Sequence, residues 1–214
     1  LFITNGDLDF DPYRPLVQDL GTDIGKVLRI NRDGTIPRDN PYVGVKGARP
    51  EIWAVGFRNP LGGAVDPKTG DLWTTENGPR GGDELNHVRR GRNYGWPVIT
   101  YGEEYSGQPV GQGITQKAGM EQPVYYWDPV IAPSGLTFYT GSMFPEWKGN
   151  LFVGSLKQTH VDRLVMNGTK VVGEERMFPE LNVRIRDVIQ GPDGALYVST
   201  DEDAGKVVRI SAKR

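Results

Sequence analysis

The tetrapeptide Leu72-Trp73-Thr74-Thr75 has the composition of a short β-strand, because an aromatic and two β-branched residues follow the turn signal Lys68-Thr69-Gly70-Asp71. The same order of a leucine, an aromatic residue and a short β run recurs at Leu1, Leu151 and Leu196. Turn signals also precede the copies at Leu151 and Leu196, and an apolar run comes before each turn. The pattern predicts three hairpins of one plan, whose first strands lie in residues 63–65, 135–139 and 185–189.

A second motif predicts the next strand of each sheet. Residues 25–30 read GKVLRI, residues 205–210 read GKVVRI, and residues 161–166 carry a looser copy, VDRLVM. Recurrence of whole hairpin-plus-strand units favours a β-propeller over a β-sandwich, which also has strands separated by frequent turns. We therefore expect one all-β domain over residues 1–214, in which residues 76–126 form the longest insertion between strands.

The composition limits the classes of protein that remain. The 29 glycines and 16 prolines in 214 residues favour many turns over long helices. Because 25 Lys and Arg residues balance 27 Asp and Glu residues, no basic surface predicts a nucleic acid or an anionic membrane as partner. The absence of cysteine excludes disulfides and thiolate catalysis, and no apolar run reaches the ~20 residues of a membrane-spanning helix.

The loop after residues 72–75 reads ENGPRGGDE and is rich in glycine. Calcium takes oxygen ligands, including backbone carbonyls. Gly78 allows a close approach of the backbone and Pro79 stiffens the turn, so their two carbonyls are candidate calcium ligands. The alternative is a loop with a structural role alone. The nearby acids are expected to be solvated unless a metal binds them: Asp83, Glu84, Glu103 and Glu104.

Four cationic residues stand where neither a strand nor a turn requires them: Arg58 (beside Asn59), Lys157, Arg184 and Arg186. Alternation along a strand places Arg184 and Arg186 on one face, which is unfavourable for a buried face unless an anion binds there. The alternative is paired surface charge, for which Asp187 is the available partner.

Six motifs in this order give the chain a family resemblance: Gly56-Phe57-Arg58-Asn59-Pro60, Glu76-Asn77-Gly78-Pro79-Arg80-Gly81-Gly82-Asp83-Glu84, Asn93-Tyr94-Gly95-Trp96-Pro97, Ala132-Pro133-Ser134-Gly135, Ser155-Leu156-Lys157 and Arg184-Ile185-Arg186-Asp187. Together they resemble the quinoprotein aldose sugar dehydrogenases of the glucose/sorbosone type, which use pyrroloquinoline quinone (PQQ) and calcium. The resemblance covers essentially the whole chain. It implies a six-bladed β-propeller, of which this chain supplies roughly the last four blades, with further blades before Leu1.

The resemblance also implies roles for the candidate residues. The carbonyls of Gly78 and Pro79 bind the calcium that holds PQQ, and Arg58 lies near the quinone C5 oxygen with Asn59 beside it. Because arginine forks suit carboxylates, three cations are implied as partners of the PQQ carboxylates: Lys157, Arg184 and Arg186. A second, structural calcium is implied at Glu84, the Tyr94 carbonyl and an acid at Glu103 or Glu104.

In this family a histidine acts as general base, and Asp7 resembles the acid that orients it. We expect that histidine to precede Leu1. The two histidines of the chain, His87 and His160, are expected to be loop or surface residues. The implied reaction is oxidation of aldose sugars at C1 to lactones by hydride transfer to the quinone, with calcium as Lewis acid and an external electron acceptor.

Two other classes remain open: a calcium-dependent propeller hydrolase such as a lactonase, and a propeller that serves only as an interaction scaffold. The quinone hypothesis requires the four cations to converge near the Gly78 and Pro79 carbonyls. An open part of a ring exposes sheet faces and edges, so we expect the missing blades or a second chain to close it. The resemblance further implies a periplasmic or secreted location.

Overall fold

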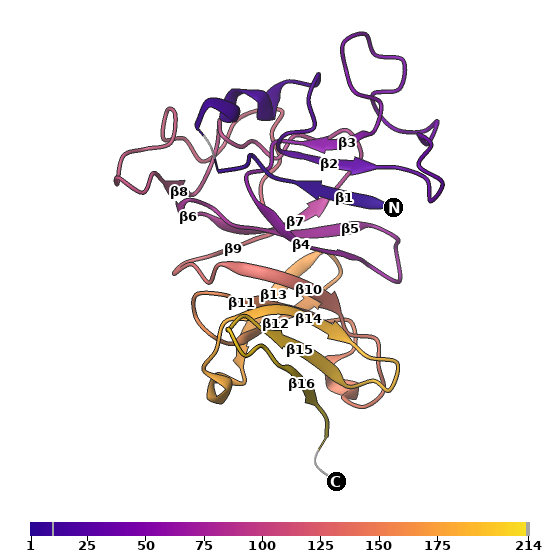
Figure 1. The fold of residues 1–214 in the computed structure, drawn as a ribbon, viewed down its shortest axis with the longest axis vertical. Coiled ribbons are helices and arrows are strands. Elements are labelled where there is room, and N and C mark those ends of the chain that lie inside the picture. The colour runs from indigo at the N-terminus through magenta and orange to yellow at the C-terminus, as the bar shows by residue number, and fades with distance from the viewer. Residues whose placement is uncertain (10, 213–214) are drawn as a thin grey trace.

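Four antiparallel sheets follow one another along the chain and are stacked along the long axis of the molecule (Figure 1). The computed structural model describes residues 1–9 and 11–212. The first two sheets contain β1 (Phe2–Asn5), β2 (Lys26–Arg29) and β3 (Ile52–Val55), then β4 (Pro60–Val65), β5 (Leu72–Glu76), β7 (Asp83–Val88) and β9 (Tyr125–Trp127). The other two contain β10 (Pro133–Phe138), β11 (Leu151–Ser155), β12 (Val161–Asn167) and β13 (Lys170–Met177), then β14 (Ile185–Gln190), β15 (Leu196–Thr200) and β16 (Val207–Ile210).

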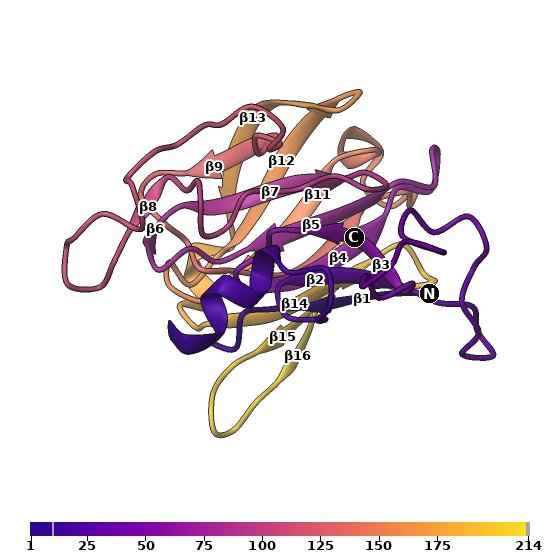
Figure 2. The ribbon, with the colours of Figure 1, turned by 90° about the horizontal axis from the view of Figure 1, so that it is seen from above.

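The remaining regular elements are short. A two-stranded ribbon pairs β6 (Arg80–Gly81) with β8 (Gly102–Glu103), and the 3-10 helices are η1 (Asp11–Gln18), η2 (Pro145–Trp147) and η3 (Pro179–Leu181). Two perpendicular views place η1, β6 and β8 at the same end of the sheets (Figures 1 and 2). Among the described residues, no helix has the length and apolar character needed to cross a bilayer.

The repeated sequence motifs form equivalent strands. The four leucine–aromatic copies are β1, β5, β11 and β15, and the second motif forms β2, β12 and β16. In every sheet the strands pair in chain order, each antiparallel to the next. The predicted all-β fold and its three hairpins are therefore confirmed. A closed six-bladed ring is not present in the described part of the chain, so that part of the prediction stays a prediction.

The predicted insertion at residues 76–126 contains a strand of the sheet. Within it, β7 pairs with β5 from Leu72–Val88 to Glu76–Glu84, and β9 pairs with β7. The irregular part is therefore shorter than expected and lies between β7 and β9, where it contributes β8 to the small ribbon. The strand was missed because its sequence, DELNHV, is mostly polar.

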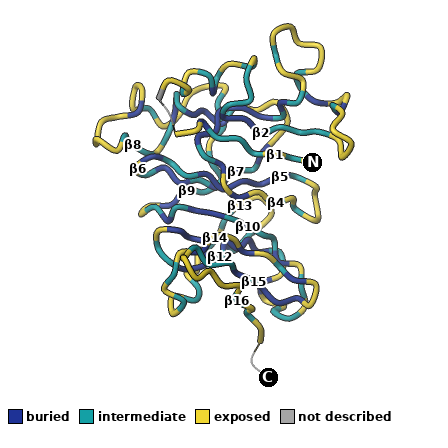
Figure 3. The backbone as a smooth tube through the Cα atoms, viewed as in Figure 1, coloured by how far each residue is buried: buried dark blue, intermediate teal, exposed yellow. Residues whose placement is uncertain are grey.

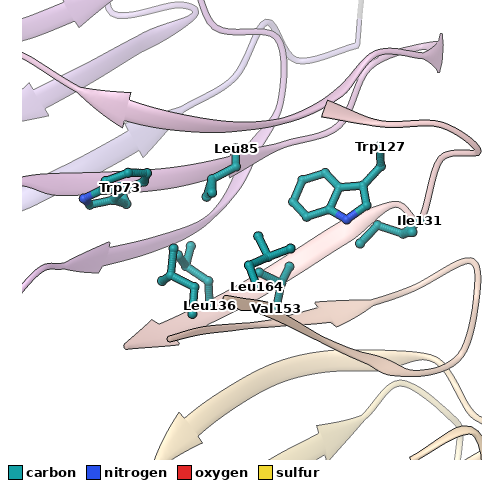
Figure 4. Packing of buried hydrophobic residues seen from close by; sticks show 8 residues of the cluster. Trp73, Leu85, Trp127, Ile131, Leu136, Val153 and Leu164 are labelled. Carbon is teal, nitrogen blue, oxygen red and sulfur yellow. The ribbon is translucent and has the colours of Figure 1, made fainter. Parts of the chain in front are cut away.

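The main apolar core lies between the second and third sheets, where strand interiors are buried (Figure 3). Figure 4 shows Trp73 and Leu85 of the second sheet facing Leu136, Val153 and Leu164 of the third. All five side chains are at most 5% exposed. Apolar surface removed from water contributes about 25 cal/mol per Å², so burial of these side chains supplies most of the free energy that holds the two sheets together.

Hydrogen bonds between sheets add to the apolar contacts near the starts of β4, β10 and β14. The Thr75 hydroxyl donates to the Ser134 carbonyl over 2.7 Å, and the Ser134 hydroxyl donates to the Ile185 carbonyl over 2.7 Å. A Cβ at Gly62 would overlap the Ser134 carbonyl oxygen, so glycine is required for this approach. The second, third and fourth sheets are thus joined at one end by buried hydrogen bonds.

A buried lysine anchors η1 to the first sheet. The Lys26 side chain is fully buried, and its ammonium donates to the carbonyls of Leu16, Val17 and Ile24 at 2.7–3.2 Å. Burial lowers the pKa of Lys26 to about 8, so the ammonium persists at neutral pH. Two of these bonds satisfy the Leu16 and Val17 carbonyls at the end of η1, and the third binds Ile24 shortly before β2.

Replacing Lys26 by methionine is expected to destabilise the protein by about 3 kcal/mol, because the Val17 and Ile24 carbonyls lose their side-chain donor and the Leu16 carbonyl loses one of three. The melting temperature should fall by roughly 6–12 °C in a chain of this size. Lys46→Met, at an exposed lysine, is the matched control and should leave the melting temperature unchanged. Equal melting curves for the two variants would contradict the anchoring role.

Candidate active site

A pocket of about 580 Å³ opens at the end of the sheets where β4 begins and β5 ends. This is the end marked by η1, β6 and β8 in Figure 1. Residues from six segments of the chain line it: Gly6, Leu8 and Asp9; Arg58 and Asn59; Asn77, Gly78, Pro79, Arg80, Gly81 and Asp83; Tyr105; Val130 and Ala132; and Lys157. Loops from three successive sheets therefore meet at one site.

Arg58 supplies a buried positive charge to the pocket. It is 4% exposed, and its Nη1 donates to the carbonyls of Asn77 and Gly78 at 3.0 and 2.9 Å. Its Nη2 forms an ion pair with Asp9 at 2.8 Å, and the guanidinium lies 5.7 Å from the centre of the Trp96 ring. Within the described residues its Nε has no hydrogen-bond acceptor. The site thus holds a cation that retains one unused donor.

The Gly78-Pro79 step has the close backbone contact that the sequence predicts. A Cβ at Gly78 would overlap the Gly81 carbonyl, so this position requires glycine. The amide oxygen of Asn77 is buried and lacks a donor among the described residues. Oxygen atoms are therefore concentrated here, as a calcium site needs, although the Gly78 carbonyl also accepts a bond from Arg58.

Asp83 is a central residue of the site that sequence reasoning missed. It is 2% exposed, and it accepts backbone N–H bonds from Gly78 at 3.1 Å, Ile131 at 2.9 Å and Ala132 at 2.7 Å. Burial raises the pKa of this carboxyl, and the three N–H donors and Lys157 oppose that rise. The expectation of a solvated acid was wrong, because Asp83 ties the loop after β5 to the loop before β10.

Lys157 reaches the same pocket from the third sheet. Its backbone N–H donates to the Ile131 carbonyl at 2.9 Å, and the N–H of Leu156 donates to the Ala132 carbonyl at 3.0 Å. The loop that carries Lys157 is therefore attached to the loop that Asp83 holds. The predicted meeting of Arg58, Lys157, Gly78 and Pro79 around one space is what the structure shows.

Arg184 and Arg186 do not line this pocket. Both form ion pairs with Asp201, at 2.7 and 3.0 Å, and both side chains are about half exposed. Arg186 instead lines a neighbouring pocket of about 380 Å³ beside Gly62 and Asp187. The expected convergence is thus met by two cations of four, and the partner of the two arginines is Asp201 rather than Asp187.

A pair of enclosed carboxyls lies behind the Gly78 loop. Glu76 and Glu84 line a small space that also borders Tyr94, and the Asn86 amide donates to both, at 3.4 and 3.3 Å. Burial raises the pKa of Glu84 to about 7 and raises that of Glu76 well above its usual range, with Glu84 adding to the latter shift. Two acids held together in this way are costly without a cation.

The acids expected to complete a second calcium site lie elsewhere. Glu103 pairs with Arg80 at 3.2 Å, and Glu104 pairs with Arg14 at 2.5 Å. Neither lines the space shared by Glu84 and Tyr94. In the described part of the chain, no group of three or more His, Asp and Glu side chains has a metal-binding arrangement. A site at Glu84 and Tyr94 would therefore depend on Glu76 or on backbone oxygens, and the role of Glu103 stays a prediction.

The metal-free protein is expected to lose stability between pH 5 and pH 7. A carboxyl whose pKa is raised in the folded state stabilises the fold fully below its unfolded pKa, and for Glu84 this contribution is lost as pH rises from 4.5 to the folded pKa of about 7. The free energy of unfolding should fall by about 1–2 kcal/mol across this range. The measurement is the melting temperature at each pH, in the presence of a calcium chelator. Glu84→Gln should flatten the curve, whereas Glu180→Gln, at an exposed position, should leave it unchanged. A flat curve for the native chain would contradict this assignment.

Asp7 and the two histidines complete the predicted set. Asp7 is 2% exposed and accepts hydrogen bonds from the Trp96 indole at 2.8 Å and the Asp9 N–H at 2.9 Å. The expectation of loop or surface residues was wrong for His87, which lies within β7 and stacks on Trp73. His160 does lie in a loop, between β11 and β12, but it is only 3% exposed and has hydrogen-bond partners at both ring nitrogens.

The chain belongs to the glucose/sorbosone dehydrogenase family, whose family model matches residues 1–209.

Relatives within and near this family are similar over nearly the whole chain. Aldose sugar dehydrogenase YliI of Escherichia coli is 45% identical over 214 residues, which cover 100% of this chain and 57% of that protein. The crystal structure of the E. coli aldose sugar dehydrogenase in its apo-form matches with a TM-score of 0.94 at 45% identity, covering 99% of this chain and 60% of that one. The PQQ-bound aldose sugar dehydrogenase of Streptomyces coelicolor matches with a TM-score of 0.72 at 26% identity, covering 98% and 57%. The chain thus spans between 57% and 60% of the length of these relatives.

Proposed function

We propose that the protein is a quinoprotein aldose dehydrogenase that oxidises sugars at C1 to lactones with PQQ and calcium. The observation that carries this proposal is the meeting of Arg58, Lys157 and the Gly78-Pro79 carbonyls around one pocket. Family membership and the PQQ-bound relative support it.

The residues of the pocket fit the chemistry of PQQ, which carries three carboxylates and a quinone. A volume of about 580 Å³ suits a ligand of this size. Arg58 has an unused buried donor, and Lys157 has no carboxylate bound to its ammonium among the described residues. Among the described residues, Arg184 and Arg186 form ion pairs with Asp201 alone. Arg186, which lines the neighbouring pocket, would serve there as a partner of a cofactor carboxylate, with Arg184 beside it on Asp201.

When bound, PQQ supplies a quinone that accepts a hydride from the sugar's C1, with calcium as a Lewis acid. The role of Arg58 follows from its burial, because a fixed positive charge in a water-poor site stabilises negative charge that develops beside it. Asn59 lines the same wall. Lys157 attracts and orients an anionic ligand, and the Gly78 and Pro79 carbonyls offer hard oxygens to a divalent cation.

The remaining assignments are proposals of the same kind. A second calcium at Glu84 and the Tyr94 carbonyl would neutralise the enclosed carboxyl pair, with Glu103 as the less direct candidate. Asp7, with both oxygens oriented by hydrogen bonds, would hold the base histidine that the family uses. The four sheets would be the last four blades of a six-bladed ring, and the protein would work in the periplasm or outside the cell with an external electron acceptor.

The test of this function is a titration of the purified protein with PQQ, with and without calcium. Glucose and a redox dye are then added. Binding that requires calcium supports the cofactor assignment, and dye reduction establishes the oxidation. Absence of PQQ binding under both conditions would overturn the proposal. A lactone substrate hydrolysed in calcium without PQQ would favour the hydrolase alternative instead.

A further inference from the structure

His160 lies outside the pocket, yet it is bonded to the loop that carries Lys157. The ring Nδ1 lies 2.9 Å from the Gln158 carbonyl oxygen, and Nε2 lies 2.8 Å from Asp162 Oδ1. The other oxygen of Asp162 accepts the Trp127 indole N–H at 2.8 Å. All three side chains are at most 3% exposed. This is a buried polar network in which every ring or carboxyl group has a partner.

The chemistry of the partners defines the state of the ring. A backbone carbonyl only accepts hydrogen bonds, so Nδ1 must carry a proton to bond Gln158. A carboxylate also only accepts, so Nε2 must carry a proton to bond Asp162. The geometry therefore fits a doubly protonated imidazolium paired with an ionised Asp162, a pair with no net charge.

The loop itself depends on the Gln158 contact. Between β11 and β12 the chain turns through Thr159, whose φ of 55° lies in the left-handed region that a β-branched residue rarely adopts. The Gln158 N–H donates to the Ser155 hydroxyl at 2.9 Å, and the His160 carbonyl accepts the Ser155 N–H at 3.1 Å. The His160 ring thus closes a tight turn in which Lys157 is the residue that faces the pocket.

We propose that His160 is a positioning residue: by donating from both ring nitrogens it fixes the 156–159 loop, and thereby holds Lys157 where an anionic ligand of the pocket binds. The part that concerns affinity rests on the proposed function. Loss of one ring proton leaves a single donor, which stays with the negatively charged Asp162. The lone pair of Nδ1 then faces the Gln158 carbonyl oxygen, and the loop loses one of the hydrogen bonds that hold it, while the backbone bonds of Leu156 and Lys157 remain.

The surroundings of the His160 ring favour its protonated form. Burial opposes the charged ring, but Asp162 and the Gln158 carbonyl outweigh this and raise the pKa of His160 above its usual value, while Arg176 of β13 opposes the rise. Tyr125 of β9 and Glu174 of β13, which share a hydrogen bond, are the other titratable groups near Asp162. We therefore expect the affinity for an anionic cofactor to fall as pH rises through the pKa of His160.

Two conservative variants separate positioning from a merely structural role. The amide nitrogen of glutamine takes the place of Nε2, so His160→Gln keeps the bond to Asp162 and loses the bond to Gln158. The amide nitrogen of asparagine takes the place of Nδ1, so His160→Asn keeps the loop bond and leaves Asp162 with one donor fewer. His87→Gln, at the other histidine, is the control because His87 lies on β7 and stacks on Trp73.

The test is PQQ affinity in the presence of calcium, measured by titration from pH 6 to pH 9 on the full chain, together with amide hydrogen exchange of residues 156–158. At pH 6.5, His160→Gln should weaken PQQ binding roughly fivefold to tenfold and speed exchange of the loop amides. His160→Asn should instead lower the melting temperature more and the affinity less. The affinity of the native chain should fall with pH, and that of His160→Gln should not.

Native affinity in His160→Gln, or losses in both variants that follow only their loss of stability, would overturn the inference. If the native chain does not bind PQQ, the proposed function fails and amide exchange alone decides the positioning role. In that case unchanged exchange of the loop amides in His160→Gln would refute it, and faster exchange in that variant alone would support it.

Discussion

Replacing Arg58 by methionine is expected to lower kcat/KM for aldose oxidation by about a thousandfold, the effect typical of removing a buried donor from developing negative charge. The variant loses a cation that is 4% exposed and donates to the Asn77 and Gly78 carbonyls. PQQ affinity should fall less than kcat, because the charge is proposed to act on the reacting quinone oxygen. The measurement is steady-state kinetics at saturating PQQ and calcium.

Two further variants sharpen this result. Arg58→Lys retains a positive charge but lacks the fork that reaches two carbonyls and Asp9 together, so it should recover only part of the activity. Arg209→Met, at an exposed arginine paired with Asp193 in the fourth sheet, should leave the kinetics unchanged. Native kcat in Arg58→Met would refute the role given to this residue.

Replacing Asp83 by alanine is expected to have the largest effect on stability. Three backbone N–H groups, of Gly78, Ile131 and Ala132, lose a buried acceptor at once. The free energy of unfolding should fall by about 4 kcal/mol and the melting temperature by roughly 10 °C. Both are measured by thermal denaturation of the metal-free protein.

Matched variants test whether the lost hydrogen bonds cause this loss of stability. Asp83→Asn keeps one oxygen for the N–H donors and should lose about half as much stability. Asp193→Ala removes an exposed carboxylate that pairs with Arg209, and should leave the melting temperature unchanged. Because Asp83 joins loops that carry Gly78 and Lys157, calcium-dependent PQQ binding should weaken in Asp83→Ala well below its melting temperature. Native PQQ affinity in Asp83→Ala at these temperatures would contradict the role of Asp83 in shaping the site.

The features that local sequence patterns encode, namely the strands and turns, were predicted correctly. Repeated leucine–aromatic segments gave the strands, their turns and their order, because period-two patterning and turn residues act over a few positions. The polar strand β7 was missed because polar contacts bury its residues: Asp83 binds the distant loop before β10, and Asn86 binds Glu76 and Glu84 in β5 and β7. A signal was present in DELNHV, whose Leu85 and Val88 are both buried.

The candidate site was predictable in its motifs and not in its contacts. Arg58, Gly78 and Lys157 share a pocket as expected, whereas the ion pair of Arg184 with Asp201 joins residues 17 positions apart. His160 was expected to be a loop or surface residue; it lies in a loop, and its burial beside Asp162 was not foreseen. The pairing of Arg184 with Asp201 follows from the register of β14 and β15, in which Ile185 pairs with Thr200, and sequence patterns alone do not fix that register.

The attachment of loops across sheets has a consequence for recombining this protein with its relatives. The carboxylate of Asp83 in one sheet binds Ile131 and Ala132 at the entry to the next, and their carbonyls in turn accept the N–H groups of Lys157 and Leu156. A single repeat is therefore not an exchangeable module. Chimeras should tolerate crossovers in the turn at residues 66–71, at the far end of the strands. The segment 140–150 is no such place, because Thr140 and Gly141 bind Gln190 of the fourth sheet and Trp147 is buried in its core. Crossovers within residues 77–83, 128–132 or 156–160 would separate co-adapted partners, so these three loops should be inherited together.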